Sequence, residues 1–257
     1  MLIHEITDGN VIRKACRSMG ITENAYFQTV LTQVLHRITR EDNIMLATIS
    51  GGRQLNGMER MVGMFVKTIP LVSVCQQQDE RTFAEAAKAM HRQGIESISR
   101  DFYPLTEVVE RHGLKPQMLY SYQDGLYDGV NLPENEEVSD MPLMLDTQKL
   151  PVEIEVWPNG KGSYVFAISY DTALYSQSDM QTLVQALANY AIHASKEGIV
   201  LSDIGMLSKE EQAELIRIGT GEKRDYDTSK TLVDMFKEQA EKMPYAVAVI
   251  DAWSSSL

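Results

Sequence analysis

The sequence predicts an α+β domain in which helices and strands form packed layers. The clearest observation is an antiparallel hairpin: Val152–Trp157 and Tyr164–Tyr170 alternate apolar and polar side chains, and the turn Pro158–Gly162 separates them. The second is a set of amphipathic helices, with apolar residues three or four positions apart. Several helices and at least four strands in one chain are typical of a layered α+β fold.

Composition narrows the class of partner. The 257 residues suit one large domain or two smaller ones, and 44% hydrophobic with 23% charged residues is an ordinary soluble composition. The net charge of -12, with no run of Lys and Arg, argues against a nucleic-acid or anionic-membrane surface. We therefore expect proteins or small molecules as partners. The chain turns polar at His4 and Glu5, so we expect no signal or membrane span at its start, and a cytoplasmic location.

The first third of the chain predicts two helices and a strand. Asp8 or Asn10 can cap a first helix that stops at Gly20. Thr22 opens a second helix that runs to about Thr39 and carries one wide apolar stripe. The stripe consists of Phe27, Val30, Leu31, Val34, Leu35 and Ile38. A buried strand, 44–49, follows and ends in Ser50-Gly51-Gly52-Arg53, a turn without the spacing of a nucleotide-binding loop.

The stretch Arg60–Val74 is almost wholly apolar and predicts a strand covered on both faces. Pro70 removes a ladder donor and places the strand at a sheet edge. Gly63 would let backbone or ligand approach closely. Lys67 is the one charge among apolar neighbours, and either its side chain reaches solvent from the strand end or it has a functional role.

The middle of the chain continues the alternation of helix and strand. Thr82 and Glu85 form a capping box for a helix with a buried face. That face carries Phe83, Ala86, Ala87, Met90 and Ile95. Met118–Gln123 predicts a strand, and residues 124–150 predict an exposed loop, either a lid or a solvated connector. Ser178 and Gln181 are expected to cap the helix after the hairpin.

After residue 200 the pattern changes. Residues 219–230 are polar and contain glycine like a linker, and a last helix spans about Leu232–Lys242 before a short strand, 247–250. One helix and one strand cannot bury a core alone. Residues 231–257 are therefore expected to be the start of a further domain.

Three motifs, and their order along the chain, resemble the C-terminal lobe of a nonribosomal peptide synthetase condensation domain. Val62–Thr68 is similar to the family's G-x-F-(V/I)-N-T element, Ser50–Arg53 to the upstream Ser-Gly-Arg, and Met118–Gln123 to a strand ending in Asn-Tyr-Gln. The resemblance implies a chloramphenicol acetyltransferase-like fold: a two-layer lobe with a mixed or antiparallel sheet and helices on one face. It also implies a division into lobe (1–200), linker (201–230) and the truncated start of an adenylation domain (231–257).

The departures from the family concern catalysis. The family's His-His-x-x-x-Asp-Gly motif is absent from these residues, and the five histidines are isolated. Lys67 stands at the family's asparagine position, and Arg100–Pro104 only loosely resembles the His-Gln-Asp-Tyr-Pro element. No alternative nucleophile motif is present, and Cys16 and Cys75 have no metal-ligand or disulfide spacing. We predict no catalytic residue and no metal site, and enzymatic activity stays open.

The resemblance implies a role in forming peptide bonds between substrates carried as thioesters on phosphopantetheine arms. This chain would bind no cofactor itself and would supply one wall of the substrate tunnel. The predicted wall residues are Ser50, Gly63, Phe65, Lys67, Ser121 and Gln123. Implied partners are peptidyl or aminoacyl carrier proteins and the missing N-terminal lobe, with self-association expected through an apolar lobe-facing surface. The alternatives are a non-catalytic carrier-binding module and a fragment of an acyltransferase of the same superfamily.

Overall fold

The computed structural model describes residues 1–76, 79–103, 105–124, 149–159, 162–222, 225, 227–247, 249–250 and 255–256. The chain forms two compact units, Met1–Lys209 and Glu210–Leu257, which are described separately. Most of the predicted loop 124–150 lies outside the described residues.

The first unit is built on a six-stranded mixed sheet in the order β1-β6-β5-β4-β2-β3. β4 pairs in parallel with β2 and β5, and the other neighbours are antiparallel. The predicted hairpin is β5 and β6. The strands are β1 (Leu2–Ile6), β2 (Asn43–Ser50), β3 (Lys67–Val74), β4 (Met118–Tyr122), β5 (Val152–Pro158) and β6 (Tyr164–Tyr170).

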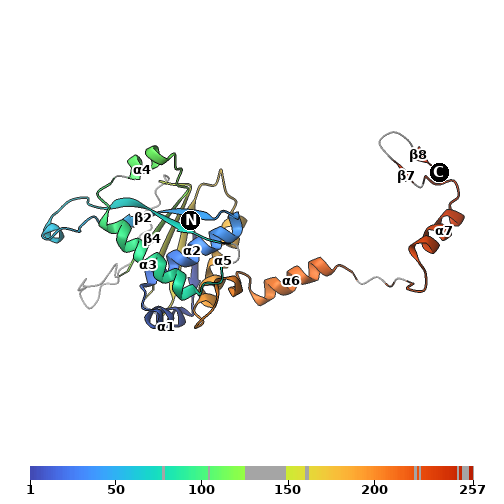
Figure 1. Cartoon of the computed structure of the whole chain (residues 1–257), viewed down its shortest axis with the longest axis horizontal. Coiled ribbons are helices and arrows are strands. Elements are labelled where there is room, and N and C mark those ends of the chain that lie inside the picture. Colours follow the sequence, from blue (N-terminus) through green and yellow to red (C-terminus); the bar gives the residue numbers. More distant parts are fainter. Residues whose placement is uncertain are drawn as a thin grey trace, which may run out of the picture. The chain divides into compact units, whose positions relative to one another are not determined.

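Helices cover one face of this sheet, which confirms the predicted α+β layers (Figure 1). Alternate strand residues such as Leu46, Tyr120 and Ile154 point into one core with the helices. Ile49 and Val72, on the opposite face, are exposed. The helices of this unit are α1 (Gly9–Met19), α2 (Glu23–Thr39), α3 (Phe83–Ser99), α4 (Leu105–His112) and α5 (Gln177–Ala194), with short 3-10 turns at Met58–Arg60 and Leu201–Asp203.

The second unit, from Glu210 on, includes all of α6 (Lys209–Thr220) except its first residue. It contains the predicted last helix, α7 (Leu232–Lys242), and a short pair of strands, β7 (Val249–Ile250) and β8 (Ser255–Ser256). No side chain of α7 is buried. The boundaries at residues 200 and 230 stay predictions.

Several predicted helix ends are confirmed, and one is wrong. Thr22 caps α2, and the Thr82–Glu85 capping box opens α3. α5, however, begins earlier than predicted, because Ser176 forms the capping box with Asp179. Ser178 and Gln181 lie inside the helix.

We expect Ser176→Ala to lower the free energy of unfolding of the first unit by about 1 kcal/mol. The Ser176 hydroxyl accepts a hydrogen bond from the Asp179 amide at 3.2 Å, and the Asp179 carboxylate accepts one from the Ser176 amide at 3.1 Å. Chemical denaturation measures the change. Gln181→Ala, at an exposed position inside the same helix, is the control and should stay within about 0.5 kcal/mol of wild type. Equal losses in both variants would contradict the cap assignment.

The expected strand over Arg60–Val74 is wrong in its first half. β3 begins at Lys67, and Met61 to Val66 belong to a loop in which Met61, Val62, Met64 and Val66 are exposed. Within β3, Ile69 and Leu71 are buried while Val72 and Val74 are exposed, so only one face is covered. The edge position indicated by Pro70 is confirmed, since β3 is an outermost strand.

Two helix residues that were expected in the core, Ile38 and Ile95, are exposed as well. Ile38 lies in the last turn of α2, and Ile95 lies four residues before the end of α3.

Candidate functional site

The predicted residues Ser50 and Lys67 lie side by side at one end of the sheet. They are register partners across β2 and β3, and therefore point to the same face. Between them the chain leaves the sheet as the loop 51–66, which projects from the sheet in Figure 1. Ser50 and Lys67 thus form the stem of this loop.

Asp101, which follows α3, joins both sides of the stem. Its carboxylate accepts a hydrogen bond of 2.6 Å from the Ser50 hydroxyl and lies 3.4 Å from the Lys67 ammonium. Asp101 is only 6% exposed, whereas the Lys67 side chain is 43% exposed. Lys67 therefore reaches solvent, as the simpler interpretation predicted, and also supplies the countercharge for a buried carboxylate.

Arg53 organises the loop beyond the stem. Its guanidinium lies 4.4 Å from the centroid of the Phe65 ring and donates to the carbonyl oxygens of Met58, Met61 (2.8 Å) and Gly63 (3.2 Å). One arginine thus connects both halves of the loop. The predicted wall residues Gly63 and Phe65 are brought together by this contact.

Ser121 and Gln123 are not on the same face as Ser50 and Lys67. Thr48 and Tyr120 are parallel register partners, so Ser50 and Tyr122 share the helix-covered face. On that face the hydroxyl of Tyr122 donates to Glu23 at 2.7 Å. Ser121 points to the opposite face, and the alternation places Gln123 there too, with its amide continuing the ladder to Val156. The six predicted wall residues therefore share an end of the sheet but not one face.

Sequence reasoning did not select Asp101 or Arg53. Both lie in segments that resemble family motifs, Arg100–Pro104 and Ser50–Arg53. That resemblance was the available signal, but it did not indicate which side chain makes the contacts. Only the fold brings Asp101 to a stem that is 34 residues away in sequence from Lys67 and 51 from Ser50.

No cysteine or histidine takes part in the contacts of Ser50, Lys67 and Asp101 described above. Burial raises the pKa of the Cys16 thiol to about 12, and it also raises the pKa of the Cys75 thiol. The rings of His36 and His193 are held by backbone carbonyls, of Glu41 at 2.7 Å and Gly205 at 2.9 Å. Among the residues that the structure describes, no group of three or more His, Cys, Asp or Glu side chains is placed to hold a metal ion.

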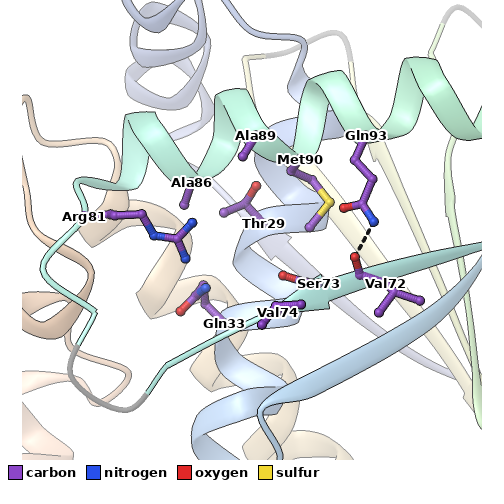
Figure 2. Close-up of a pocket in the computed structure, with 10 residues that line it drawn as sticks. All are labelled: Thr29, Gln33, Val72, Ser73, Val74, Arg81, Ala86, Ala89, Met90 and Gln93. Atoms are coloured by element: carbon purple, nitrogen blue, oxygen red, sulfur yellow. Dashed lines mark hydrogen bonds between the residues drawn. The ribbon is translucent and has the colours of Figure 1, made fainter.

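A separate cavity of about 250 Å³ lies between α2, α3 and β3 (Figure 2). Gln93 donates to the backbone carbonyl of Val72 at its rim, and Arg81 is paired with the Asp79 carboxylate. Its lining thus includes the amides of Gln33 and Gln93, the hydroxyls of Thr29 and Ser73, and the guanidinium of Arg81, whose charge is already neutralised.

No helix in the described part of the chain is long and apolar enough to cross a membrane.

The Condensation domain family model matches residues 3–216, which is most of the chain. The chain belongs to the condensation domain family. Tyrocidine synthase 2 of Brevibacillus parabrevis is 26% identical over 247 residues, which cover 90% of this chain and 7% of that protein. Gramicidin S synthase 2 of Brevibacillus brevis is 26% identical over 261 residues, which cover 93% of this chain and 6% of that protein. The chain thus spans a small part of these synthetases.

Solved structures share the condensation domain fold. The first condensation domain of the CDA synthetase has a TM-score of 0.62 and 12% identity, over 80% of this chain and 48% of that one. The X-domain from teicoplanin biosynthesis has a TM-score of 0.66 and 18% identity, over 80% of this chain and 49% of the X-domain chain. A four-domain nonribosomal peptide synthetase bound to AMP and glycine matches over 96% of this chain, and 20% of its own, with a TM-score of 0.74 and 17% identity. The chain covers about half of the CDA synthetase condensation domain and about half of the X-domain.

Proposed function

We propose that this chain is the C-terminal lobe of a peptide-bond-forming condensation domain and supplies one wall of its substrate tunnel. The observation that carries the proposal is the family match over residues 3–216, combined with coverage of only 48% of a solved condensation domain. The second unit would then begin an adenylation domain, consistent with the match of 96% of the chain to a four-domain synthetase.

The proposed wall is the end of the sheet and not one of its faces. β2 and β4 are parallel, so Ser50 and Gln123 come to the same end although their side chains lie on opposite faces. Ser50, Lys67 and Asp101 provide a hydroxyl, an ammonium and a carboxylate there. Such groups can orient an amine or a thioester carbonyl, but proton removal would rest on a histidine of the other lobe. Substrates would arrive on the phosphopantetheine arms of carrier proteins.

Reconstitution of amide formation tests the proposal. The chain would be mixed with an N-terminal lobe that carries His-His-x-x-x-Asp-Gly and with donor and acceptor carrier proteins loaded with aminoacyl thioesters. We expect no product from the chain alone and dipeptide from the pair, because loss of general acid–base assistance alone costs about 10²- to 10⁴-fold in rate. A pair whose catalytic histidines are replaced by alanine is the control. Product formed equally by the chain alone would overturn the proposal.

A second candidate is an interaction module that binds a partner protein without chemistry. The X-domain, which shares the fold, is also known in a complex with OxyB, with a TM-score of 0.64 to this chain. Titration of labelled carrier proteins distinguishes the two functions. Shifts of carrier amide signals without dipeptide, even with the N-terminal lobe present, would favour the module.

A further inference from the structure

The outer edge of β3 is open toward the C-terminal end of the strand. β3 is an outermost strand, and the amide of Cys75 donates at 2.7 Å to the carbonyl of Asp42, which lies opposite it in the register with β2. Because ladder bonds alternate along an antiparallel strand, Val72 and Val74 direct their amides and carbonyls away from β2. Pro70 has the same orientation, so its missing amide costs no ladder bond. Val72 is 38% exposed and Val74 is 62% exposed.

A side-chain carboxamide already bonds to this edge. Gln93 of α3 donates to the carbonyl of Val72, as Figure 2 shows, and so occupies the position of an amide from an added strand. A carboxamide offers the same donor and acceptor as a peptide group. Among the described residues, no group accepts a hydrogen bond from the amides of Val72 and Val74. Edge strands with such unpaired groups are templates for pairing with another chain.

The cavity beside this edge contains buried polar side chains. Thr29 and Gln33 of α2 line it and are 1% and 5% exposed. The Gln33 side chain donates to the weakly accepting sulfur of Cys75 at 3.5 Å, and its amide oxygen has no partner in the described part of the chain. A buried carboxamide without a strong hydrogen bond costs free energy. A polar group that enters the cavity of about 250 Å³ would therefore be stabilised there.

The cavity favours an uncharged occupant. Arg81 is the one charged residue among the described residues that line it, and its Nε donates to the Asp79 carboxylate at 2.8 Å. A further charge in the cavity would have no partner and would be costly. Ala86, Ala89 and Met90 of α3 form an apolar side of the cavity (Figure 2). The lining thus suits a side chain with an apolar stem and an uncharged polar end.

We infer that the outer edge of β3 and this cavity form a docking site for an extended, uncharged segment of a partner polypeptide. Added strands combine main-chain pairing with pockets for alternate side chains. Here the main chain would pair with Val72 and Val74, and one side chain would enter the cavity beside Gln33. The inference goes beyond the proposed tunnel wall, since Lys67 begins β3 and the docking site lies at the last residues of the strand. Two copies of a chain with net charge -12 repel each other, which disfavours self-pairing.

Titration with an uncharged peptide tests the docking site. The probe is acetyl-Thr-Val-Gln-Val-Thr-amide, added up to millimolar concentration to the isotope-labelled 257-residue chain. We expect saturable shifts of the backbone amide signals of Val72 and Val74 and of the side-chain amide signals of Gln33. The same peptide with Asp in place of its central Gln should bind at least about 10-fold more weakly. Absence of shifts at these three residues, or equal binding of the two peptides, would overturn the inference.

Two pairs of variants locate the contact. Val74→Pro removes an outward amide and spares the ladder with β2, so it should weaken peptide binding at least about 10-fold. Thr68→Pro, at an outward position near the start of β3, should bind like wild type. Gln33→Leu removes the carboxamide at similar volume and should also weaken binding at least about 10-fold. Gln28→Leu is its matched control, because Gln28 is equally buried on α2 and lies outside the cavity lining.

The results also separate the docking site from the tunnel and from self-pairing. Peptide binding that is unchanged in both Val74→Pro and Gln33→Leu overturns the docking site. If sedimentation shows that wild type self-associates and Val74→Pro is monomeric, the occupant is a second copy and the assigned partner is wrong. Dipeptide formation in the reconstituted pair should be retained in Val74→Pro. Its loss in a variant that still folds would place this edge in the tunnel and overturn the inference of a separate site.

Discussion

Gly52→Ala should open the stem of the loop between β2 and β3. Gly52 has φ +65°, and a Cβ at this position would lie 1.8 Å from the carbonyl oxygen of Phe65. A left-handed conformation costs an L-residue about 1 to 2 kcal/mol, and the clash is with backbone, which cannot rotate away. We expect a loss of at least about 2 kcal/mol in unfolding free energy, which lowers Tm by about 4 to 8 °C for a unit of this size. Thermal unfolding measures it.

Gly51→Ala provides the control for this prediction. A Cβ at Gly51 meets no atom within 4 Å. The substitution should therefore leave Tm within about 2 °C of wild type, the range expected of a surface change. If Gly51→Ala and Gly52→Ala unfold at the same temperature, the close approach of Gly52 to Phe65 does not exist in solution.

Asp101→Ala should destabilise the first unit by about 2 to 3 kcal/mol. The larger part of this loss of stability comes from Ser50. Its hydroxyl is buried and would lose the carboxylate to which it donates a hydrogen bond of 2.6 Å. The pair with Lys67 contributes less, because at 3.4 Å and with the lysine side chain 43% exposed it resembles a surface ion pair. Urea denaturation measures the change.

Two variants test how the expected loss of stability is divided between the hydrogen bond to Ser50 and the ion pair with Lys67. Asp101→Asn keeps an acceptor for Ser50 and should lose only about 1 kcal/mol. Arg100→Ala removes the exposed pair with Glu96 in the neighbouring position and should change stability by less than about 1 kcal/mol. A loss as large in Arg100→Ala as in Asp101→Ala would show that the buried carboxylate has no special role.

Much of the layered fold could be predicted because its signals are local. Thr22 and the Thr82–Glu85 pair satisfy helix amides within one turn, and the hairpin of β5 and β6 is specified by alternation and a short turn. The error at Ser178 arose because Ser178–Gln181 has the capping-box spacing as well, whereas the structure uses Ser176–Asp179.

The candidate site could be predicted only in part. The motif resemblance selected Ser50, Gly63, Phe65 and Lys67, and the structure brings them to one loop and its stem. It also selected Ser121 and Gln123, which the parallel register of β2 and β4 places on the opposite face. Registers between strands distant in sequence are set by the whole sheet, so a strand's own pattern cannot supply them.

The sequence by itself determined the fold class, most helix and strand positions and the edge position of β3, because propensity, capping and alternation act over a few residues. Tertiary structure decided that Met61–Val66 leaves the sheet and exposes its apolar side chains. The apolar pattern of that segment is the same for a buried strand and for an exposed loop. The difference lies in the contacts of Arg53 and Gly52 with Phe65 inside the loop and of Asp101 with the stem residue Ser50.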